Sequence, residues 1–172
     1  MKGKVTLNRR VFVLFTCFLT SIVNTGCNTS KGENVLERNK NLVRQMNDLV
    51  WNKGDLDRMD EFFSPHFVRH FLPGDSELKG VDSLREHERM LREAFPDWRE
   101  EIKHIVAEED LVVIHFVSTG TNLGSWLDKP PTGRKIIINE MSILRIEDDK
   151  VAEQWLLPDI YSMEQQLAQT EN

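Results

Sequence analysis

The stretch LVVIHFVST, residues 111–119, is rich in the branched and aromatic side chains that favour β-strands. Three similar runs lie before and after it, separated by polar segments. The segments EED, residues 108–110, and EDDK, residues 147–150, suit tight hairpins between antiparallel neighbours. We therefore predict four strands in the second half of the chain, at residues 102–107, 111–119, 136–146 and 151–157.

Helical periodicity precedes these strands, because apolar residues recur on one face of three segments. Gly54, Pro65 and Pro96 interrupt the patterns and mark where the helices stop. We expect three N-terminal helices, at about 35–53, 56–63 and 81–95. Three helices followed by about four strands is an α+β layout, in which the helices pack in the concave face of a curved, mainly antiparallel sheet. Such a cone can enclose a pocket.

The composition is that of a globular domain, with 40% apolar and 29% charged residues in a chain of 172. The net charge is −6, and the first 27 residues contain no acidic side chain, so the remainder is more acidic still. An acidic surface repels phosphate backbones, and the chain has no stripe of lysine or arginine that would neutralise them. We expect a single domain and no nucleic-acid partner.

The N-terminus has the layout of a signal peptide, with a basic start and an apolar run at residues 11–23. That run is too short for a transmembrane helix, which needs about 20 apolar residues. A small residue followed by Cys27 resembles the bacterial lipobox, where the thiol is lipidated and becomes the mature N-terminus. We predict an exported lipoprotein of the cell envelope that contacts the membrane only through lipidated Cys27. The alternative is plain secretion with an incidental cysteine.

This interpretation divides the chain into a lipoprotein signal peptide at 1–27, a polar tether at 28–34 and a folded domain at 35–172. Cys17 lies in the segment to be removed, so the mature chain has one cysteine and cannot form an internal disulfide.

A set of short motifs, in order along the chain, resembles the SnoaL-like polyketide cyclases, or ester cyclases. These proteins have the nuclear transport factor two-like and ketosteroid isomerase-like cone fold. The resemblance covers residues 35–168, almost all of the predicted domain. The motifs are VWNKGDLD at 50–57, FVRH at 67–70, FPDW at 95–98, TGT at 119–121, PPTGR at 130–134, EQW at 153–155, Asp159, and Gln166-Leu167.

The resemblance implies a cofactor-free enzyme that closes a ring in a polyketide ester by an intramolecular aldol reaction. In such enzymes an acidic side chain after the last strand is the general acid and base, and Asp159 occupies that position. One carboxyl group in a dry pocket can serve both steps when desolvation raises its pKa, and the apolar residues 155–158 would desolvate Asp159. The alternative is that Asp159 is the N-cap of a terminal helix at 160–167.

Two histidines are the other catalytic candidates. His115 interrupts an apolar strand and could hydrogen-bond a substrate carbonyl, or it is paired in the core or on a dimer face. His70 matches a family position near the pocket mouth. Asn139 and Glu140 are adjacent in a strand, so one must point to each face, and whichever faces inward is a polar group of the pocket. In our enzyme hypothesis Asn139 joins the two histidines in orienting the carbonyl.

Two tryptophans, Trp98 and Trp155, are candidates for the apolar walls of a substrate site, although an aromatic residue in a strand is more often simply core. His66 and His70 have the four-residue spacing of a helical metal pair, but the segment is bracketed by prolines and no third ligand is evident, so we expect no metal. Nothing indicates a nucleotide, haem or flavin, because no glycine-rich phosphate loop is present. We expect no cofactor.

The sequence therefore leads to two hypotheses of different kinds. The first is an enzyme that acts on a small hydrophobic carbonyl-containing molecule by cyclisation, or by isomerisation or hydrolysis on the same scaffold. The second is a noncatalytic surface lipoprotein that binds such a molecule, which is favoured by export and by Gln154 at a position where the family usually has His. We also expect a homodimer through the outer face of the sheet, because residues 136–138 are apolar on both faces of their strand.

Overall fold

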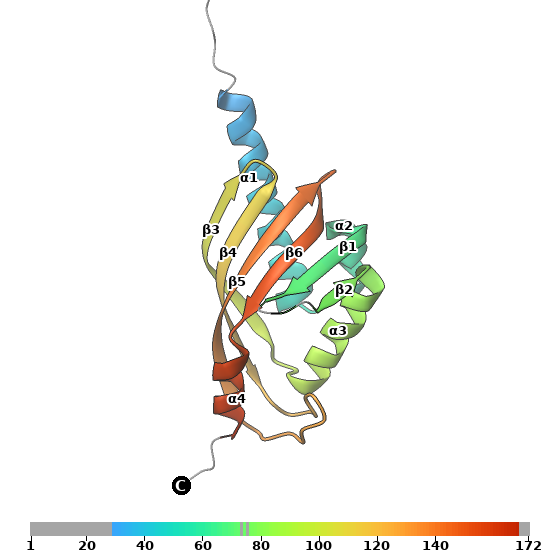
Figure 1. Ribbon diagram of the computed structural model, residues 1–172, viewed down its shortest axis with the longest axis vertical. Helices are drawn as coiled ribbons and strands as arrows, with labels where there is room; N and C mark the ends of the chain where they lie inside the picture. Colours follow the sequence, from blue (N-terminus) through green and yellow to red (C-terminus); the bar gives the residue numbers. More distant parts are fainter. Residues whose placement is uncertain (1–28, 73, 75, 169–172) are drawn as a thin grey trace, which may run out of the picture.

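One curved, open sheet forms the body of the molecule (Figure 1). The computed structural model describes residues 29–72, 74 and 76–168. Strand β6 pairs antiparallel with β5 and parallel with β1, so the sheet is mixed, in the order β2-β1-β6-β5-β4-β3. The strands are β1 (Phe63–Phe71), β2 (Glu77–Lys79), β3 (Arg99–Glu108), β4 (Leu111–Thr121), β5 (Lys135–Glu147) and β6 (Lys150–Pro158).

The predicted α+β class is confirmed, and the four predicted strands correspond to β3, β4, β5 and β6. Strands β1 and β2 are additional, and most of β1 lies where the sequence pattern predicted no regular structure. Pro65 suggested a break, but the pairing of β1 with β6 is irregular between Phe63 and Val68, so the missing N–H of Pro65 removes no ladder hydrogen bond.

The described residues contain four α-helices rather than three. They are α1 (Thr29–Met46), α2 (Met59–Phe62), α3 (Val81–Ala94) and α4 (Ile160–Ala168), with a π-helical turn η1 (Asn47–Asn52) and a 3-10 turn η2 (Leu56–Arg58). Helix α1 begins before the expected start at Val35, so residues assigned to the tether are helical here. No helix in the described part of the chain is long and apolar enough to cross a bilayer. The predicted signal peptide and Cys27 lie outside the described residues.

Alternating side chains divide each long strand between an inner face and an outer face. On β5 the even-numbered residues are buried and the odd-numbered residues are exposed. The inner face carries an apolar cluster with Ile136 and Ile138 near one end and a second cluster with Leu144 and Ile146 at the other. The polar residues Glu140 and Ser142 lie between these clusters, which places them in the middle of the inner face.

Helix α4 covers the end of β5 that extends beyond its pairing with β6 (Figure 1). The Gln166 side chain accepts a hydrogen bond from the Ile137 N–H at 2.8 Å and donates one to the Ile137 carbonyl at 2.9 Å. One amide side chain thus replaces a missing strand neighbour, which gives the terminal Gln-Leu motif a structural role.

Candidate active site

A cavity of about 1130 Å³ lies between the inner face of the sheet, α3 and the loop that joins β4 to β5. This volume lies slightly above the range usual for small-molecule sites. The loop is held by Asn122, whose Oδ1 accepts from Thr132 N–H at 2.8 Å and whose Nδ2 donates to the Gly124 carbonyl at 2.8 Å. The apolar wall is formed mainly by Trp51, Phe71, Trp98, Ile114, Phe116, Trp126, Ile138 and Leu156.

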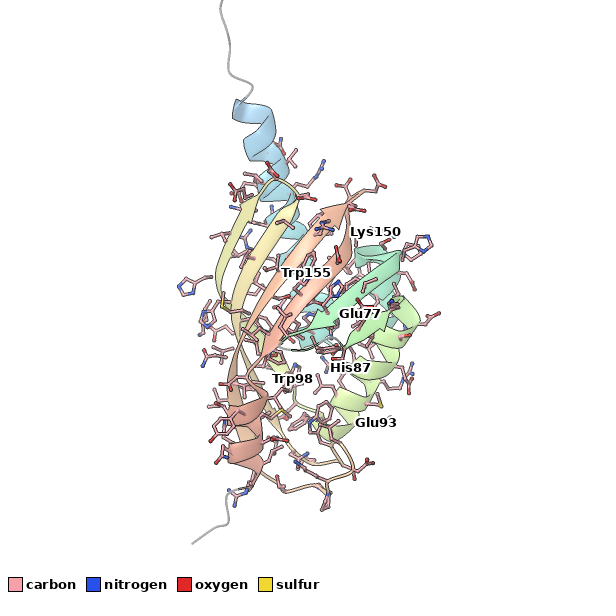
Figure 2. The ribbon with its side chains drawn as sticks, in the orientation of Figure 1. Glu77, His87, Glu93, Trp98, Lys150 and Trp155 are labelled. Carbon is pink, nitrogen blue, oxygen red and sulfur yellow. The ribbon has the colours of Figure 1, made fainter. Side chains whose placement is uncertain are left out.

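Trp98 can lie against the sheet because residue 120 is glycine. A Cβ atom at Gly120 would come within 3.0 Å of the Trp98 ring and 3.1 Å of Phe95 Cβ. The TGT motif therefore makes room for an aromatic wall of the cavity. Figure 2 shows Trp98 near the start of β3, with His87 and Glu93 along α3.

Four of the charged residues that line this largely apolar cavity come from four different elements of its wall. They are Arg69 on β1, Glu88 on α3, Glu100 on β3 and Glu140 on β5. Arg69, Glu88 and Glu140 are only 3%, 6% and 6% exposed. A buried charge is costly unless it is paired and hydrogen-bonded, so the partners of each group define what the site can do.

Arg69 and Glu88 form a buried ion pair, with 2.9 Å between Nη1 and Oε1. Arg69 Nε also donates to Gln154 Oε1 at 2.9 Å, and Gln154 Nε2 donates to Ser142 Oγ at 2.9 Å. Burial opposes ionisation of Glu88, but the Arg69 guanidinium and His87 outweigh it and hold the pKa of Glu88 below its ordinary value. This pair is therefore a compensated structural unit.

Glu100 accepts two hydrogen bonds from groups that the π-helical turn and the start of β3 place around it. Asn47 Nδ2 donates to Oε2 at 3.0 Å, and Trp98 Nε1 donates to Oε1 at 3.2 Å. The carboxyl group is enclosed although part of the residue is accessible to solvent. Burial, and then the nearby carboxyls of Glu140 and Glu88, raise the pKa of Glu100 well above its ordinary value.

Glu140 forms no salt bridge with any residue that the structure describes. Burial raises its pKa to about 7, and the Ser118 hydroxyl and Arg69 only partly offset this effect. Glu140 Oε1 and Ser118 Oγ are nevertheless buried without a hydrogen-bond partner of good geometry among the described residues. A carboxyl group that titrates near neutrality in an apolar cavity is suited to both accepting and donating a proton.

Asp159 lies at the rim of the cavity, where β6 ends and α4 begins. Its Oδ1 accepts a hydrogen bond from the Ser162 N–H at 3.0 Å, so it caps α4 as the alternative hypothesis stated. The hydrogen bonds from Ser162 lower the pKa of Asp159, which makes this carboxylate a weaker base than Glu140. Among the predicted site residues, Asp159 and Trp98 are the two that the structure brings to the cavity.

His115 and Asn139 lie instead on the outer face of the sheet. His115 Nδ1 is 3.0 Å from His104 Nδ1, and His115 Nε2 is 3.2 Å from Asn139 Oδ1. His115 is thus paired, as the alternative for this residue stated. The inward-facing member of the adjacent pair on β5 is Glu140 and not Asn139.

His70 and Trp155 also lie on the outer face. Their rings stack with centroids 5.3 Å apart, and His70 Nε2 is 2.8 Å from Glu153 Oε1. The Arg145 guanidinium lies 5.0 Å from the centroid of the Trp155 ring. Neither His70 nor Trp155 lines the cavity.

Arg69, Glu88 and Glu100 were not singled out from the sequence as site residues. A signal existed for Glu88, because it lies one helical turn from both Leu84 and Leu91 on the buried stripe of α3, where a charge needs a partner. His66 and His70 lie on a strand rather than a helix, so their spacing does not make a helical metal pair. The described residues contain no group of three His, Cys, Asp or Glu side chains placed to hold a metal ion.

The fold and cavity define a class of protein, a nuclear transport factor two-like α+β cone that encloses a ligand-sized, mostly apolar cavity with buried carboxyl groups. Residues 41–167 match the model of the family described as SnoaL-like polyketide cyclase. The chain belongs to the SnoaL-like polyketide cyclase family.

Solved structures agree with this assignment. A candidate SnoaL-like polyketide cyclase from Jannaschia sp. CCS1 is 22% identical, with a TM-score of 0.74, over 80% of this chain and 96% of that chain. AclR, a candidate hydroxylase from Streptomyces galilaeus, is 29% identical, with a TM-score of 0.69, over 80% and 85% of the two chains. TsrD from Streptomyces laurentii is 23% identical, with a TM-score of 0.69, over 77% and 96%. No curated protein matches this chain.

Proposed function

We propose that this protein catalyses cofactor-independent acid/base chemistry on a small hydrophobic carbonyl compound, with Glu140 as the group that moves the proton. Membership of the cyclase family supports a cyclase-type reaction. The observation that carries the proposal is the Glu140 carboxyl, buried in the cavity wall with a pKa of about 7 and no salt bridge to any described residue.

In the proposed reaction the Glu140 carboxylate removes a proton from a carbon next to a carbonyl group. The resulting enolate carbon attacks a second carbonyl of the same molecule, forming a carbon–carbon bond and an alkoxide. The alkoxide takes the proton back from Glu140, so the carboxylate is regenerated and no other reactant is consumed. Arg69 also lines the cavity and lowers the pKa of Glu140 electrostatically, but its charge is already compensated by Glu88 at 2.9 Å.

The test is turnover of a mixed pool of small ketones, esters and polyketide mimics, followed by mass spectrometry. We expect Glu140→Gln to lower the rate by about 10²- to 10⁴-fold, the usual contribution of a general acid or base. Asp159→Asn is the matched control, because Asp159 is the carboxyl that the family resemblance selects. If Asp159→Asn abolishes turnover while Glu140→Gln retains it, the role of Glu140 is refuted and Asp159 is the catalytic carboxyl.

A noncatalytic binding protein is the second candidate function, and the hydrogen bonds of Gln154 favour it. Both ends of its amide are used to hold Arg69 and Ser142, so this position offers the cavity no titratable group where the family usually has His. In that case a component of the pool would be retained unchanged by the wild type and by both variants.

Export as a lipoprotein through Cys27 and formation of a homodimer both stay predictions. The outer face supports the second of these, because Ile137, Met141 and Leu157 are 56%, 49% and 44% exposed there.

A further inference from the structure

The charged groups of the cavity are not balanced. Arg69 is already paired with Glu88 at 2.9 Å. Glu100 and Glu140 form no salt bridge with any residue that the structure describes, although both line the same cavity. Two buried carboxyl groups therefore lack a counter-ion.

The surroundings of Glu100 are arranged for an ionised carboxylate. An indole N–H can only donate, so Trp98 Nε1 cannot reverse its hydrogen bond to Oε1. The Asn47 amide is oriented as well, because its Oδ1 accepts from Asn52 Nδ2 at 3.1 Å, leaving its own Nδ2 to donate to Glu100 Oε2. Asn52 is fixed in turn by hydrogen bonds to the backbone N–H and carbonyl of Glu100, at 2.8 and 3.0 Å.

The geometry around Glu100 thus favours the ionised form, while the electrostatic environment opposes it. Burial and the carboxyls of Glu140 and Glu88 raise the pKa of Glu100 and disfavour its ionised form, and Arg69 compensates only in part. Glu140 indicates independently that a partner for a carboxyl group is missing here. It is 6% exposed and lines the same cavity, and its Oε1 atom has no hydrogen-bond partner among the described residues. What this part of the cavity lacks is a positive charge.

We propose that the natural ligand carries a basic amine, whose ammonium group pairs with Glu100. This inference deepens the proposed function and rests on it for the location of the ligand, since it adds an amine to the carbonyl compound. The wall suits such a ligand, because Trp98 contacts Glu100, Phe116 is the cross-strand neighbour of Glu140, and aromatic rings attract cations.

The charged groups that act on Glu100 are Glu140 on β5, Glu88 and Arg92 on α3, and Arg69 on β1. Arg92 forms no salt bridge with Glu100, and its Nη2 donates to the Trp51 backbone carbonyl. An arriving ammonium therefore favours the ionised form of Glu100, and a proton held by this carboxyl is released to solvent. The same positive charge lies near Glu140 and favours its ionised, proton-accepting form.

The experiment is calorimetric binding of three matched probes to the protein. They are a naphthyl ketone ending in a dimethylaminopropyl chain, the neutral isostere ending in an isopropyl group, and the corresponding carboxylate. We expect the amine to bind at least about tenfold more tightly than the isostere, and the carboxylate to bind most weakly. In two buffers of different ionisation enthalpy, only the amine should release a proton.

Variants separate this proposal from the proposed reaction. In Glu140→Gln the preference for the amine should persist, whether or not Glu140 is catalytic, because it comes from Glu100. The proton release should become smaller without being lost, because the part that comes from Glu140 is removed. In Glu100→Gln the amine and the isostere should bind equally. Equal binding of the two probes to the wild-type protein overturns the proposal, and this measurement does not depend on whether Glu100→Gln folds.

Discussion

On strand β5, Glu140 and its neighbour Asn139 face opposite sides of the same sheet. Glu140 points into the cavity, where its Oε1 atom has no hydrogen-bond partner among the described residues. Asn139 points outward, where its Oδ1 is 3.2 Å from His115 Nε2. One position along the chain thus separates a polar group without a partner from a polar group that has one.

The same contrast holds for charged groups across the two faces. On the outer face Arg145 forms an ion pair with Glu153 and lies against Trp155, partly open to water. On the inner face Arg69 and Glu88 are paired, but Glu100 and Glu140 are not. Buried polar groups are normally satisfied, so the unsatisfied ones point to function while the satisfied ones point to stability.

The largest difference that we expect between the faces concerns the two arginine–glutamate pairs. Arg69→Met leaves the buried Glu88 carboxyl without its partner and should lower the free energy of unfolding by about 3–5 kcal/mol. Arg145→Met removes a partly exposed pair and should cost about 1 kcal/mol or less. Denaturant unfolding of both variants measures the difference directly. Equal losses would show that the inner pair is no more important to the fold than the outer one.

The contrast between faces also explains how far the sequence could predict the fold. Runs of branched residues identified the four long strands, because their apolar pattern needs burial in a sheet. Strand β1 could not be found in this way, since FSPHFVRHF contains a proline and two histidines. It is a strand because it pairs with β6 and β2, which are contacts distant in the sequence.

The candidate site was less predictable, because face assignments depend on register. Glu100 and His104 are four residues apart on β3 and would share a face in a regular strand. The irregular pairing between Ile102 and His104 places Glu100 opposite Ser118 and His104 opposite His115, on different faces. On β5 residues 136–138 are apolar on both faces of the strand. The sequence alone therefore could not show that Glu140, and not Asn139, faces the cavity.

The next effect is a loss of stability with rising pH, which comes from the raised pKa of Glu140 on the inner face. The folded protein holds a proton on Glu140 up to a pKa of about 7, whereas the ordinary value is 4.5. Between these values the folded state binds more protons, so stability falls as pH rises through that window, by up to about 3 kcal/mol. Glu140→Gln removes this contribution, and should therefore gain stability relative to wild type between about pH 5 and about pH 8.

Asp159→Asn is the control of opposite sign. The pKa of Asp159 is lowered, so its contribution is present above the ordinary value of 3.8 and is lost as pH falls through the lower value in the folded state. The deficit of Asp159→Asn relative to wild type should accordingly shrink in acid. If the stabilities of wild type and Glu140→Gln changed in parallel with pH, the pKa of Glu140 would be the same in the folded and the unfolded protein. Glu140 would then be ionised in the folded protein near neutral pH.

The smallest effect should come from the outer face. His115→Leu removes the contacts of the ring nitrogens with His104 and Asn139, at 3.0 and 3.2 Å. Because both hydrogen bonds are exposed, we expect a loss of about 1 kcal/mol or less in unfolding experiments. Turnover and probe binding should not change, since the cavity lies on the other side of the sheet. A folded His115→Leu protein without turnover would instead mean that the outer face takes part in the reaction, and the division of roles between the two faces would have to be abandoned.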